Sequence, residues 1–159
     1  MSDTLVLRGA TAVDAPAIAA TIAAAFEQYR GKLQPESGAF RETAEAIASE
    51  LASDSGAIVA ERNGRMVGCV MVKLLDSDLY FGRLSVLPSA RGQGLGKRLV
   101  EAVEDEARRR ELLGVRCGVR IVLTENQRLF ASLGYVEIGR EAHEGFDHPT
   151  SINLRKPLA

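Results

Sequence analysis

Residues 79–98 read LYFGRLSVLPSARGQGLGKR, and this stretch decides how the chain folds. An apolar run ends at Pro88, a glycine-rich turn follows, and the pattern predicts a helix from about Gly94. A strand that passes through such a turn into a helix presents the unpaired N–H groups of the first helical turn to an anion. Three basic side chains add positive charge there, Arg91, Lys97 and Arg98. The stretch therefore predicts a site for a ligand that carries phosphate.

Two common phosphate-binding motifs do not fit these residues. A Walker loop needs G-x-x-x-x-G-K-[ST], and Arg91 stands where its first glycine belongs. A Rossmann fingerprint needs G-x-G-x-x-G, and Lys97 stands at its last glycine. The motif that is present is R-x-x-G-x-G, with Gly94 and Gly96 as its glycines, after a strand that ends V-L-P.

This segment resembles the pyrophosphate-binding segment of the GNAT superfamily, the acetyl-coenzyme A-dependent N-acetyltransferases. The alternative is an ordinary strand–turn–helix connection that happens to be basic. The resemblance implies that backbone amides of the turn bind the pyrophosphate of coenzyme A. The residues concerned are Arg91, Gly92, Gln93, Gly94, Leu95, Gly96 and Lys97.

Length and composition narrow the class of protein. The chain has 159 residues, of which 46% are apolar, which suits one domain with a packed core. Its 20 basic and 21 acidic residues nearly cancel, which argues against a nucleic-acid binder. Cys69 and Cys117 lie in apolar runs and are predicted to be buried free thiols in a reducing compartment. No signal peptide pattern and no 18-residue apolar stretch are present, so we expect a cytoplasmic protein without a membrane span.

The hydrophobic periodicity predicts the order β-α-α-β-β-β-α-β-α-β-β. The expected strands cover residues 4–8, 57–61, 66–75, 79–87, 115–123, 135–140 and 151–156. The expected helices cover about 14–30, 40–51, 94–110 and 125–133, with Asp14 capping the first. Such an order predicts an α+β fold with a mixed, mostly antiparallel sheet of about seven strands and helices on both faces. The GNAT fold has this order, so residues 1–159 are expected to form a single N-acetyltransferase domain.

The resemblance also assigns contacts to coenzyme A. In the family, the strand before the glycine turn is splayed from the next strand, and its main chain pairs with the pantetheine arm. Here those main-chain contacts would come from Leu84, Ser85 and Val86. Asn126 would hydrogen-bond the pantetheine and Phe130 would lie near the sulfur, whereas the alternative for Asn126 is satisfaction of local backbone.

Direct acetylation of an amine needs a base, an oxyanion donor and a proton for the leaving thiolate. By resemblance, the oxyanion donor is the backbone N–H near Val86. Family members often carry Tyr at the position of Phe130, and strand 79–87 contains no carboxylate, so neither a general acid nor a base is assigned there. The candidate bases are Glu27, Asp76, Asp78, Glu137 and His143, and Tyr80 and His143 are the catalytic side-chain candidates.

Three residues are predicted to face the acceptor: Tyr29, Arg83 and Arg120. Two arginines on interior strands need partners, because a buried unpaired guanidinium is unfavourable. They bind a carboxylate of the acceptor, or, in the preferred interpretation, pair with Asp76, Asp78 or Glu137. The histidines lack the spacing of metal ligands, so no metal is expected.

The sequence thus predicts an acetyl-CoA-dependent acyltransferase that acetylates a primary amine of a small molecule directly, since no cysteine is placed as an acyl-enzyme nucleophile. One alternative is an acyl-CoA-binding module of the same fold with weak catalysis, which Phe130 and the strand without carboxylates leave open. Another is a protein or peptide N-acetyltransferase. A homodimer is compatible with the sequence, and neither nucleic acid nor membrane is expected as a partner.

Overall fold

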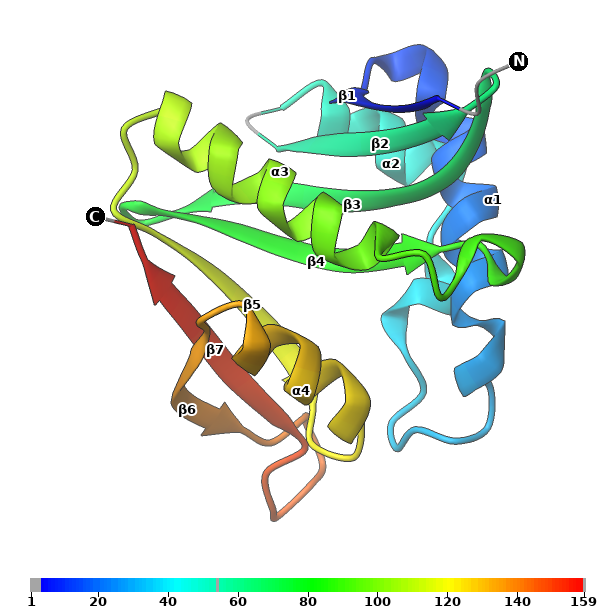
Figure 1. Cartoon of the computed structure of the whole chain (residues 1–159). Helices are drawn as coiled ribbons and strands as arrows, with labels where there is room; N and C mark the ends of the chain where they lie inside the picture. The colour runs from blue at the N-terminus through cyan, green and yellow to red at the C-terminus, as the bar shows by residue number, and fades with distance from the viewer. Residues whose placement is uncertain (1–3, 54, 159) are drawn as a thin grey trace.

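The computed structural model describes residues 4–53 and 55–158, and it shows a seven-stranded sheet in the order β1-β2-β3-β4-β5-β7-β6 (Figure 1). Each neighbouring pair of strands is antiparallel except β4 and β5, which run parallel. The strands are β1 (Leu5–Gly9), β2 (Gly56–Arg62), β3 (Arg65–Leu75), β4 (Asp78–Val86), β5 (Gly114–Arg120), β6 (Val136–Glu141) and β7 (Ser151–Pro157). The predicted element order and the mixed, mostly antiparallel sheet are confirmed.

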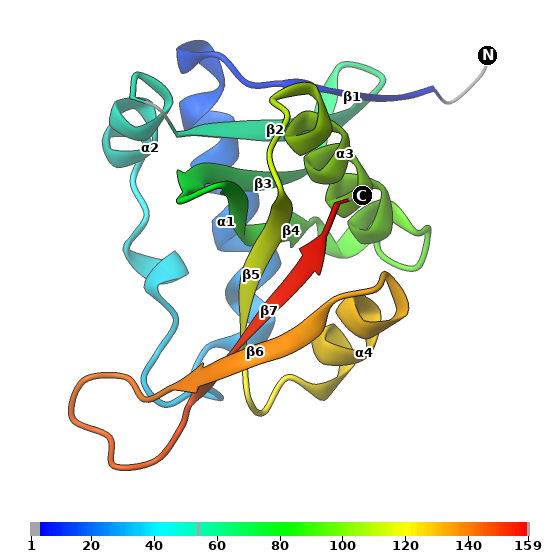
Figure 2. The same ribbon diagram turned by 90° about the vertical axis from the view of Figure 1, so that its left-hand side faces the viewer.

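Helices cover both faces of the sheet, as Figures 1 and 2 show. Within the described residues the α-helices are α1 (Ala15–Phe26), α2 (Ala44–Leu51), α3 (Leu95–Arg109) and α4 (Thr124–Ser132). On one face, Ile18 of α1 and Ile47 of α2 belong to one buried apolar cluster. On the other, Leu99 of α3 and Phe130 of α4 belong to a second cluster. The sheet therefore has a core on each side.

Strand β2 shows how the sequence builds both cores. Ile58 and Ala60 are buried in the core beneath α3, whereas Ala57 and Val59 are buried in the core beneath α1. Successive side chains of a strand point to opposite faces, so a continuous apolar run is what a strand buried on both sides requires. The Asn63-Gly64 turn after it has φ of 55° and 76°, the left-handed pair that a two-residue hairpin needs.

Asp14 occupies the predicted N-cap position of α1, but its side chain makes no capping hydrogen bond to that helix. Asp14 is itself helical (φ −79°, ψ −11°), because it also ends the 3-10 turn η1 (Ala12–Asp14) that precedes α1. Its carboxylate accepts a hydrogen bond from the Thr11 N–H (2.8 Å) and two from the Arg8 guanidinium (2.8 and 2.9 Å). The hydrogen bonds from Arg8, above all, lower the pKa of Asp14 to about 2. Asp14 therefore ties the helix start to β1.

The predicted helix over 40–51 is wrong at its start. Residues 38–41 form the 3-10 turn η3 (Gly38–Arg41), and α2 begins only at Ala44. The Thr43 hydroxyl accepts a hydrogen bond from the Ala46 N–H (3.1 Å), which caps the helix there. The chain between the two helices is therefore longer and less regular than predicted, and several of its residues line the cavity described below.

The sheet opens between β4 and β5. Their ladder ends at Phe81 opposite Cys117, although β4 continues to Val86 and β5 to Arg120. The predicted continuation of this last strand to residue 123 is wrong, since the strand ends at Arg120. Beyond Phe81 the edge of β4 that faces β5 is therefore not paired with it, and the two halves of the sheet diverge as a V (Figure 1).

A β-bulge in β4 lies at the start of this opening. Met71 of β3 faces Gly82, but Cys69 faces Ser85, so β4 has one residue more than β3 over this interval. Within the bulge, Arg83 adopts φ of 54°. A left-handed conformation is uncommon for a residue other than glycine, and it re-aims the side chain. The bulge therefore sets where Arg83 points.

The closed end of the V is held by a buried carboxylate. Asp78 is 2% exposed, and it accepts hydrogen bonds from Arg116 of β5 and from Arg155 of β7, the latter at 2.8 and 3.0 Å. Gly114 leaves the space for this group, since a Cβ there would lie 2.6 Å from Arg155 Nη2 and 2.9 Å from Asp78 Oδ1. One side chain thus joins three strands where the sheet begins to split.

Neither a membrane helix nor a metal cluster is found in the described residues. Across residues 4–53 and 55–158, no helix combines the length and the apolar character that crossing a membrane requires. The same residues contain no group of three or more His, Cys, Asp or Glu side chains placed to hold a metal ion.

Candidate active site

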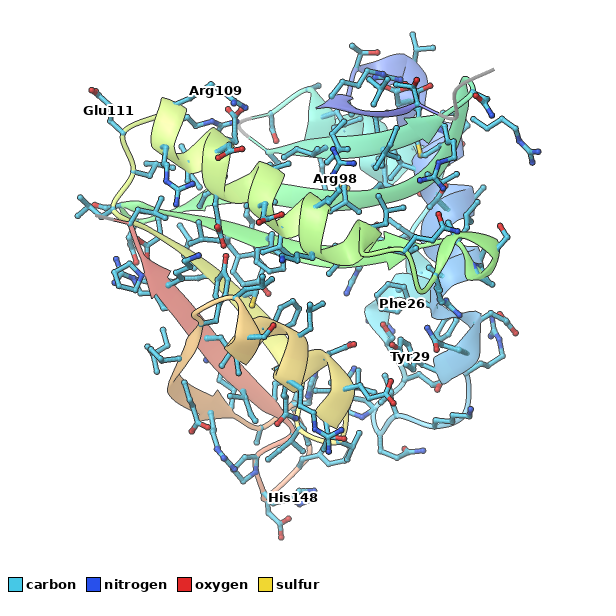
Figure 3. All side chains as sticks on the ribbon, in the orientation of Figure 1. Phe26, Tyr29, Arg98, Arg109, Glu111 and His148 are labelled. Carbon is cyan, nitrogen blue, oxygen red and sulfur yellow. The ribbon has the colours of Figure 1, made fainter. Side chains whose placement is uncertain are left out.

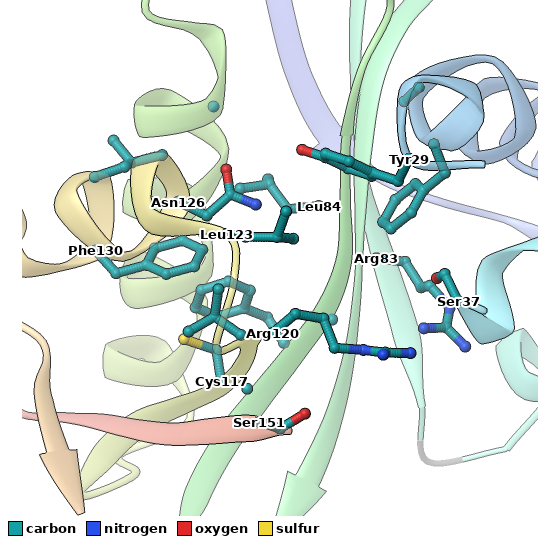
Figure 4. A pocket seen from close by; sticks show the side chains of 18 of the residues that line it. Tyr29, Ser37, Arg83, Leu84, Cys117, Arg120, Leu123, Asn126, Phe130 and Ser151 are labelled. Atoms are coloured by element: carbon teal, nitrogen blue, oxygen red, sulfur yellow. The ribbon is translucent and has the colours of Figure 1, made fainter. Parts of the chain in front are cut away.

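A cavity of about 1010 Å³ occupies the opening between β4 and β5. One wall of the cavity is formed by the glycine turn and α3, a second by α4, and a third by the segment from α1 to η3. The structure brings all but two of the sequence-predicted site residues to this cavity: Tyr29, Tyr80, Arg83, Leu84, Val86, Arg91, Gly92, Gly94, Leu95, Gly96, Lys97, Arg120, Asn126, Phe130 and His143. Figure 4 shows several of them from close by.

Ser85 and Gln93 do not line the cavity with the others. Ser85 is 1% exposed, and its hydroxyl donates a hydrogen bond to the Arg83 carbonyl (2.9 Å). The Gln93 side-chain oxygen accepts a hydrogen bond from Arg62 of β2. Only main-chain atoms of these two residues remain available for a ligand in the cavity.

The glycine turn has the backbone conformation that an anion site at the start of a helix requires. Gly92 and Gly94 have φ of 78° and 74°, which lets the chain curl into the start of α3. The first backbone bond of the helix runs from the Arg98 N–H to the Gly94 carbonyl (3.2 Å). The N–H groups of Leu95, Gly96 and Lys97 precede that bond and have no intrahelical acceptor. They are therefore available to an anion at the helix start.

Gly96 lines the cavity close to Leu84 of β4 and Leu129 of α4. A Cβ built there would lie 3.8 Å from Leu129 Cδ2 and 4.0 Å from Leu84 Cδ2, which is ordinary contact distance. Any larger side chain would extend between Leu84 of β4 and Leu129 of α4, across the opening. The residues present therefore fit a cosubstrate such as coenzyme A, because the space that it needs is kept free by a missing side chain.

The main chain at the end of β4 also faces the opening. The Leu87 N–H donates to the Val67 carbonyl of β3 (2.9 Å), so it points away from β5. Backbone N–H groups of successive strand residues alternate in direction, which turns the Val86 N–H toward β5. Because β5 has diverged there, this amide faces the cavity, where an oxyanion or an amide of pantetheine could accept its hydrogen bond.

Two arginines of the predicted cradle have other roles. The Arg91 guanidinium donates a hydrogen bond to the Ala25 carbonyl of α1 (2.8 Å), so the glycine turn is fastened to the helix that leads to Tyr29. Arg98 is exposed and does not line the cavity, and Figure 3 shows it on α3. Of the three basic side chains, Lys97 is thus the one that lines the cavity without a described hydrogen-bond partner.

Asn126 and Phe130 of α4 are the side chains predicted to contact the pantetheine arm and the sulfur of coenzyme A. Asn126 lines the cavity, and its side chain points toward Leu84 across the opening (Figure 4). Phe130 is only 5% exposed and packs edge-to-face against Phe81 and Tyr135, with ring centroids 5.6 and 6.2 Å apart. Phe130 is therefore mainly a core residue with one edge on the cavity wall.

The cysteines are buried free thiols, as predicted. Cys117 lines the cavity, but burial raises its pKa to about 12, and burial likewise raises the pKa of Cys69 to about 12. A thiol with such a pKa carries almost no thiolate at neutral pH, and the thiolate is the nucleophile. Neither cysteine is therefore suited to act as a nucleophile.

The predicted ion-pair partners of the two interior arginines are wrong. Arg83 Nε donates to Glu42 Oε1 (3.1 Å), a residue just before α2. Arg120 donates to backbone carbonyls, at 2.7 Å to Pro35 and 3.4 Å to Glu36. Asp78 instead belongs to the buried cluster at the closed end of the V. The reason is the irregular segment 30–43, which folds against the cleft and supplies partners that strand pairing could not reveal.

Four of the five candidate bases lie outside the cavity. Glu27 and Glu137 are exposed and pair with Arg30 and Arg140, and Asp76 is 76% exposed outside the cavity. Asp78 is held by two arginines that lower its pKa, so it is a poor base. Among the five predicted candidates, only His143 lines the cavity.

His143 lies in the loop after β6 and is anchored by Thr150. Its backbone N–H donates to Thr150 Oγ1 (2.9 Å), and its ring Nδ1 forms a second, short hydrogen bond with the same oxygen. Burial, and then the positive charge of Arg120, lower the pKa of His143 below its usual 6.5. At neutral pH the imidazole is therefore uncharged and able to accept a proton.

Replacing Arg120 with glutamine should raise the pKa of His143, because the change removes a positive charge that disfavours the imidazolium. The chain has two histidines, so NMR follows both ring resonances in one titration, and His148 lies at the tip of the same loop (Figure 3). We expect the wild-type His143 midpoint below 6.5 and a higher midpoint in Arg120→Gln. An unchanged midpoint in the variant would show that burial alone sets it.

The sequence missed part of the acceptor side of the cavity. Ser37 and Arg41 line it from the 30–43 segment, and Lys73 of β3 lines it over the Tyr80 ring (5.3 Å from Nζ to the centroid). Glu141 lines it from the end of β6. No motif precedes Ser37 or Arg41, so only the packing of this segment against the cleft could reveal them.

Comparison with known families decides the class of protein. The sequence matches the family described as "Acetyltransferase (GNAT) family" over residues 20–135, which is more than half of the chain. The chain belongs to the GNAT family of acetyltransferases. The match includes the glycine turn, the splayed strands and α4, whereas the cavity residues of β6, its following loop and β7 lie outside it. The predicted acyltransferase is confirmed.

Individual GNAT proteins agree with this assignment. An IAA acetyltransferase from Azospirillum brasilense is 34% identical over 104 residues, which are 64% of this chain and 67% of the relative. The ribosomal-protein-S18-alanine N-acetyltransferase from Escherichia coli has a TM-score of 0.81 at 19% identity, with 98% of this chain and 95% of that chain covered. The PaiA N-acetyltransferase from Thermoplasma acidophilum, solved in complex with coenzyme A, has a TM-score of 0.81 at 16% identity, covering 98% and 99%. The two structures show the fold.

Proposed function

We propose that this GNAT protein transfers an acetyl group from acetyl-CoA directly to a primary amine of a small molecule. The observation that supports this most strongly is the cleft itself. The free N–H groups at the start of α3 and the Val86 amide open into the same cavity as Tyr29 and His143. A phosphate-bearing donor and an amine acceptor would therefore meet there.

Each part of the reaction has a residue that could support it. Acetyl-CoA, when bound, supplies a thioester carbonyl that an amine can attack. The N–H groups of Leu95, Gly96 and Lys97 would hold its pyrophosphate, and the Val86 N–H would stabilise the oxyanion. His143, uncharged at neutral pH, would accept the proton of the amine directly or through water.

The leaving thiolate does not require a side-chain acid, and Phe130 cannot donate a proton. A thiol has a pKa of about 8.5, so its thiolate is a fair leaving group by itself. Tyr80 lines the cavity, and burial raises its pKa, which keeps its hydroxyl protonated. That hydroxyl is the one candidate among the predicted catalytic side chains for a proton donor that would assist the thiolate.

The walls of the acceptor side support a small acceptor over a protein segment. The 30–43 segment approaches from one side and Arg120 of β5 donates across to the Pro35 carbonyl (2.7 Å), which links the two walls. His143 and Ser151 line the cavity from the β6–β7 end. A link across the opening leaves less room for an extended chain than for a small molecule.

The test has two steps. Saturating acetyl-CoA, with ADP as the control ligand, should raise the unfolding midpoint, and at a hundred times its dissociation constant it adds about 2.7 kcal/mol to the unfolding free energy. Thiol release is then measured with small amines and with peptides. Release with small amines and none with peptides supports the proposal. Release with peptides alone contradicts it, and binding without release favours the weakly catalytic module.

A further inference from the structure

We propose that the acceptor is an amine that also carries a carboxylate, and that this carboxylate binds between Arg120, Arg83 and Arg41 on the acceptor side of the cavity. This inference rests on the proposed function and names the chemical class of its acceptor. It follows from three positively charged side chains that converge on one place and have too few described anionic partners.

Arg120 is the first of these side chains. It comes from the splayed end of β5 and crosses the cavity toward Arg83 and Ser37, as Figure 4 shows. Its hydrogen bonds among the described residues go to the Pro35 and Glu36 carbonyls. A carbonyl orients a guanidinium without neutralising its charge, and the guanidinium has five N–H donors, so several stay available. Burial and then the charge of Arg83 lower the pKa of Arg120, and the charge of Glu36 opposes this shift.

Arg83 and Arg41 converge beside it. An ideal Cβ on Gly38 would lie 2.6 Å from Arg83 Nη2 and 3.3 Å from Arg41 Nη2. The two nitrogens are therefore no further apart than the sum of these distances. Gly38 has no side chain, and this is what lets the two guanidinium groups approach the same point of the cavity wall.

Within the described residues these guanidinium groups have few direct carboxylate partners, although Glu36 acts electrostatically on Arg120 and Glu50 on Arg83. Glu42 pairs with Arg83 through Nε, which leaves the Nη groups of Arg83 free of a described carboxylate. Arg120 and Arg41 have no described salt bridge, although both line the cavity. Three like charges at close range are unfavourable unless an anion lies between them. A carboxylate fits this role because it accepts a bidentate pair of hydrogen bonds from a guanidinium.

The position also bears on the reach of the acceptor. Arg83 lies three residues before Val86 in β4, and extended chain covers about 3.3 Å per residue, so the main chains of the two residues are at most about 10 Å apart. The Arg83 side chain extends from the strand toward Gly38 and Glu42, so the carboxylate of the acceptor would bind away from the β4 main chain.

The experiment compares matched acceptors. A series of amino acids is assayed against the amino alcohols of the same carbon skeleton, which keep the amine and replace the carboxylate with a neutral group. Each pair is measured as kcat/KM with the wild-type chain, Arg120→Gln, Arg41→Gln and Arg140→Gln. Arg41 is exposed, so its variant should fold even if Arg120→Gln does not. Arg140 pairs with Glu137 on β6 outside the cavity and serves as the charge-matched control.

We expect the wild type to prefer the amino acids by about 10- to 100-fold, the range of a hydrogen bond to a charged group. Arg120→Gln or Arg41→Gln should reduce that preference at least fivefold, and Arg140→Gln should not change it. Turnover of both classes with no preference, or a preference that survives both cavity variants, would overturn the inference and leave the proposed function standing. No turnover of any amine would overturn both.

Discussion

Replacing Gly96 with leucine is expected to abolish acetyl-CoA binding while the protein stays folded. The missing side chain at this position keeps open the space between Leu84 and Leu129, where a Cβ would already be in contact at 3.8 to 4.0 Å. A leucine would fill the opening next to the helix start, so the dissociation constant should rise at least a hundredfold. Leucine favours a helix by about 0.8 kcal/mol over glycine, so the melting temperature of the ligand-free protein should not fall.

The measurement is calorimetric titration with acetyl-CoA, together with thermal unfolding of the free proteins. Gly96→Ala provides a graded control, because its methyl group makes only ordinary contacts and should weaken binding less. Gly139→Leu on β6 controls for the added side chain, since nothing lies within 4 Å of its ideal Cβ. Wild-type affinity in Gly96→Leu would mean that coenzyme A does not pass through this opening, and the cofactor contacts proposed above would have to be withdrawn.

Replacing Asp78 with asparagine is expected to cause the largest loss of stability. The change removes the buried negative charge that Arg116 and Arg155 share, so two guanidinium groups lose their partner at the closed end of the V. Breaking a fully buried ion pair costs about 3–5 kcal/mol. Because the two arginine side chains remain 31% and 29% exposed, we expect a loss of about 2–3 kcal/mol in urea unfolding at pH 7.

The stabilisation that Asp78 contributes is expected to decrease as pH falls. Hydrogen bonds from Arg155, above all, hold the pKa of Asp78 below its ordinary value of 3.8. The stabilisation is therefore complete above about pH 4 and is lost as pH falls through the lower pKa of the folded protein. The wild type should lose more unfolding free energy between pH 4 and pH 2 than Asp78→Asn does.

Asp76→Asn is the matched control for this experiment. Asp76 lies two residues away and 3.8 Å from Arg116, but it is 76% exposed. An exposed pair contributes little, so this variant should differ from the wild type by less than about 0.5 kcal/mol. Equal losses in the two variants would show that net charge, and not the buried carboxylate, stabilises the closed end.

The elements of this protein follow from its local sequence. Alternating or continuous apolar runs predict the seven strands, because side-chain direction has a period of two residues in a strand. The Asn63-Gly64 pair and the glycines at 92 and 94 predict the turns, because few other residues adopt positive φ at low cost. The turn of residues 91–97, which we propose binds phosphate, could be predicted in the same way, since its backbone groups would be the ligands.

The sequence indicated several residues of the acceptor side but not their hydrogen-bond partners. Arg83 pairs with Glu42, which is 41 residues away, and Arg120 with the Pro35 carbonyl, which is 85 residues away. The prediction chose Asp76, Asp78 and Glu137 for these arginines, because strand neighbours are the only partners that periodicity reveals. The irregular segment 30–43 has no such period, and its position depends on how it packs against the cleft.

The sequence by itself therefore determined the order of the elements and the glycine turn before α3, both of which depend on contacts between near neighbours or on backbone conformation. The tertiary structure alone decided which carboxylate holds the closed end, which of the candidate bases lines the cavity, and that Arg41 joins Arg83 and Arg120. These contacts join residues far apart in the chain, and hydrogen bonds and charges act over a few ångströms in space whatever the separation in sequence.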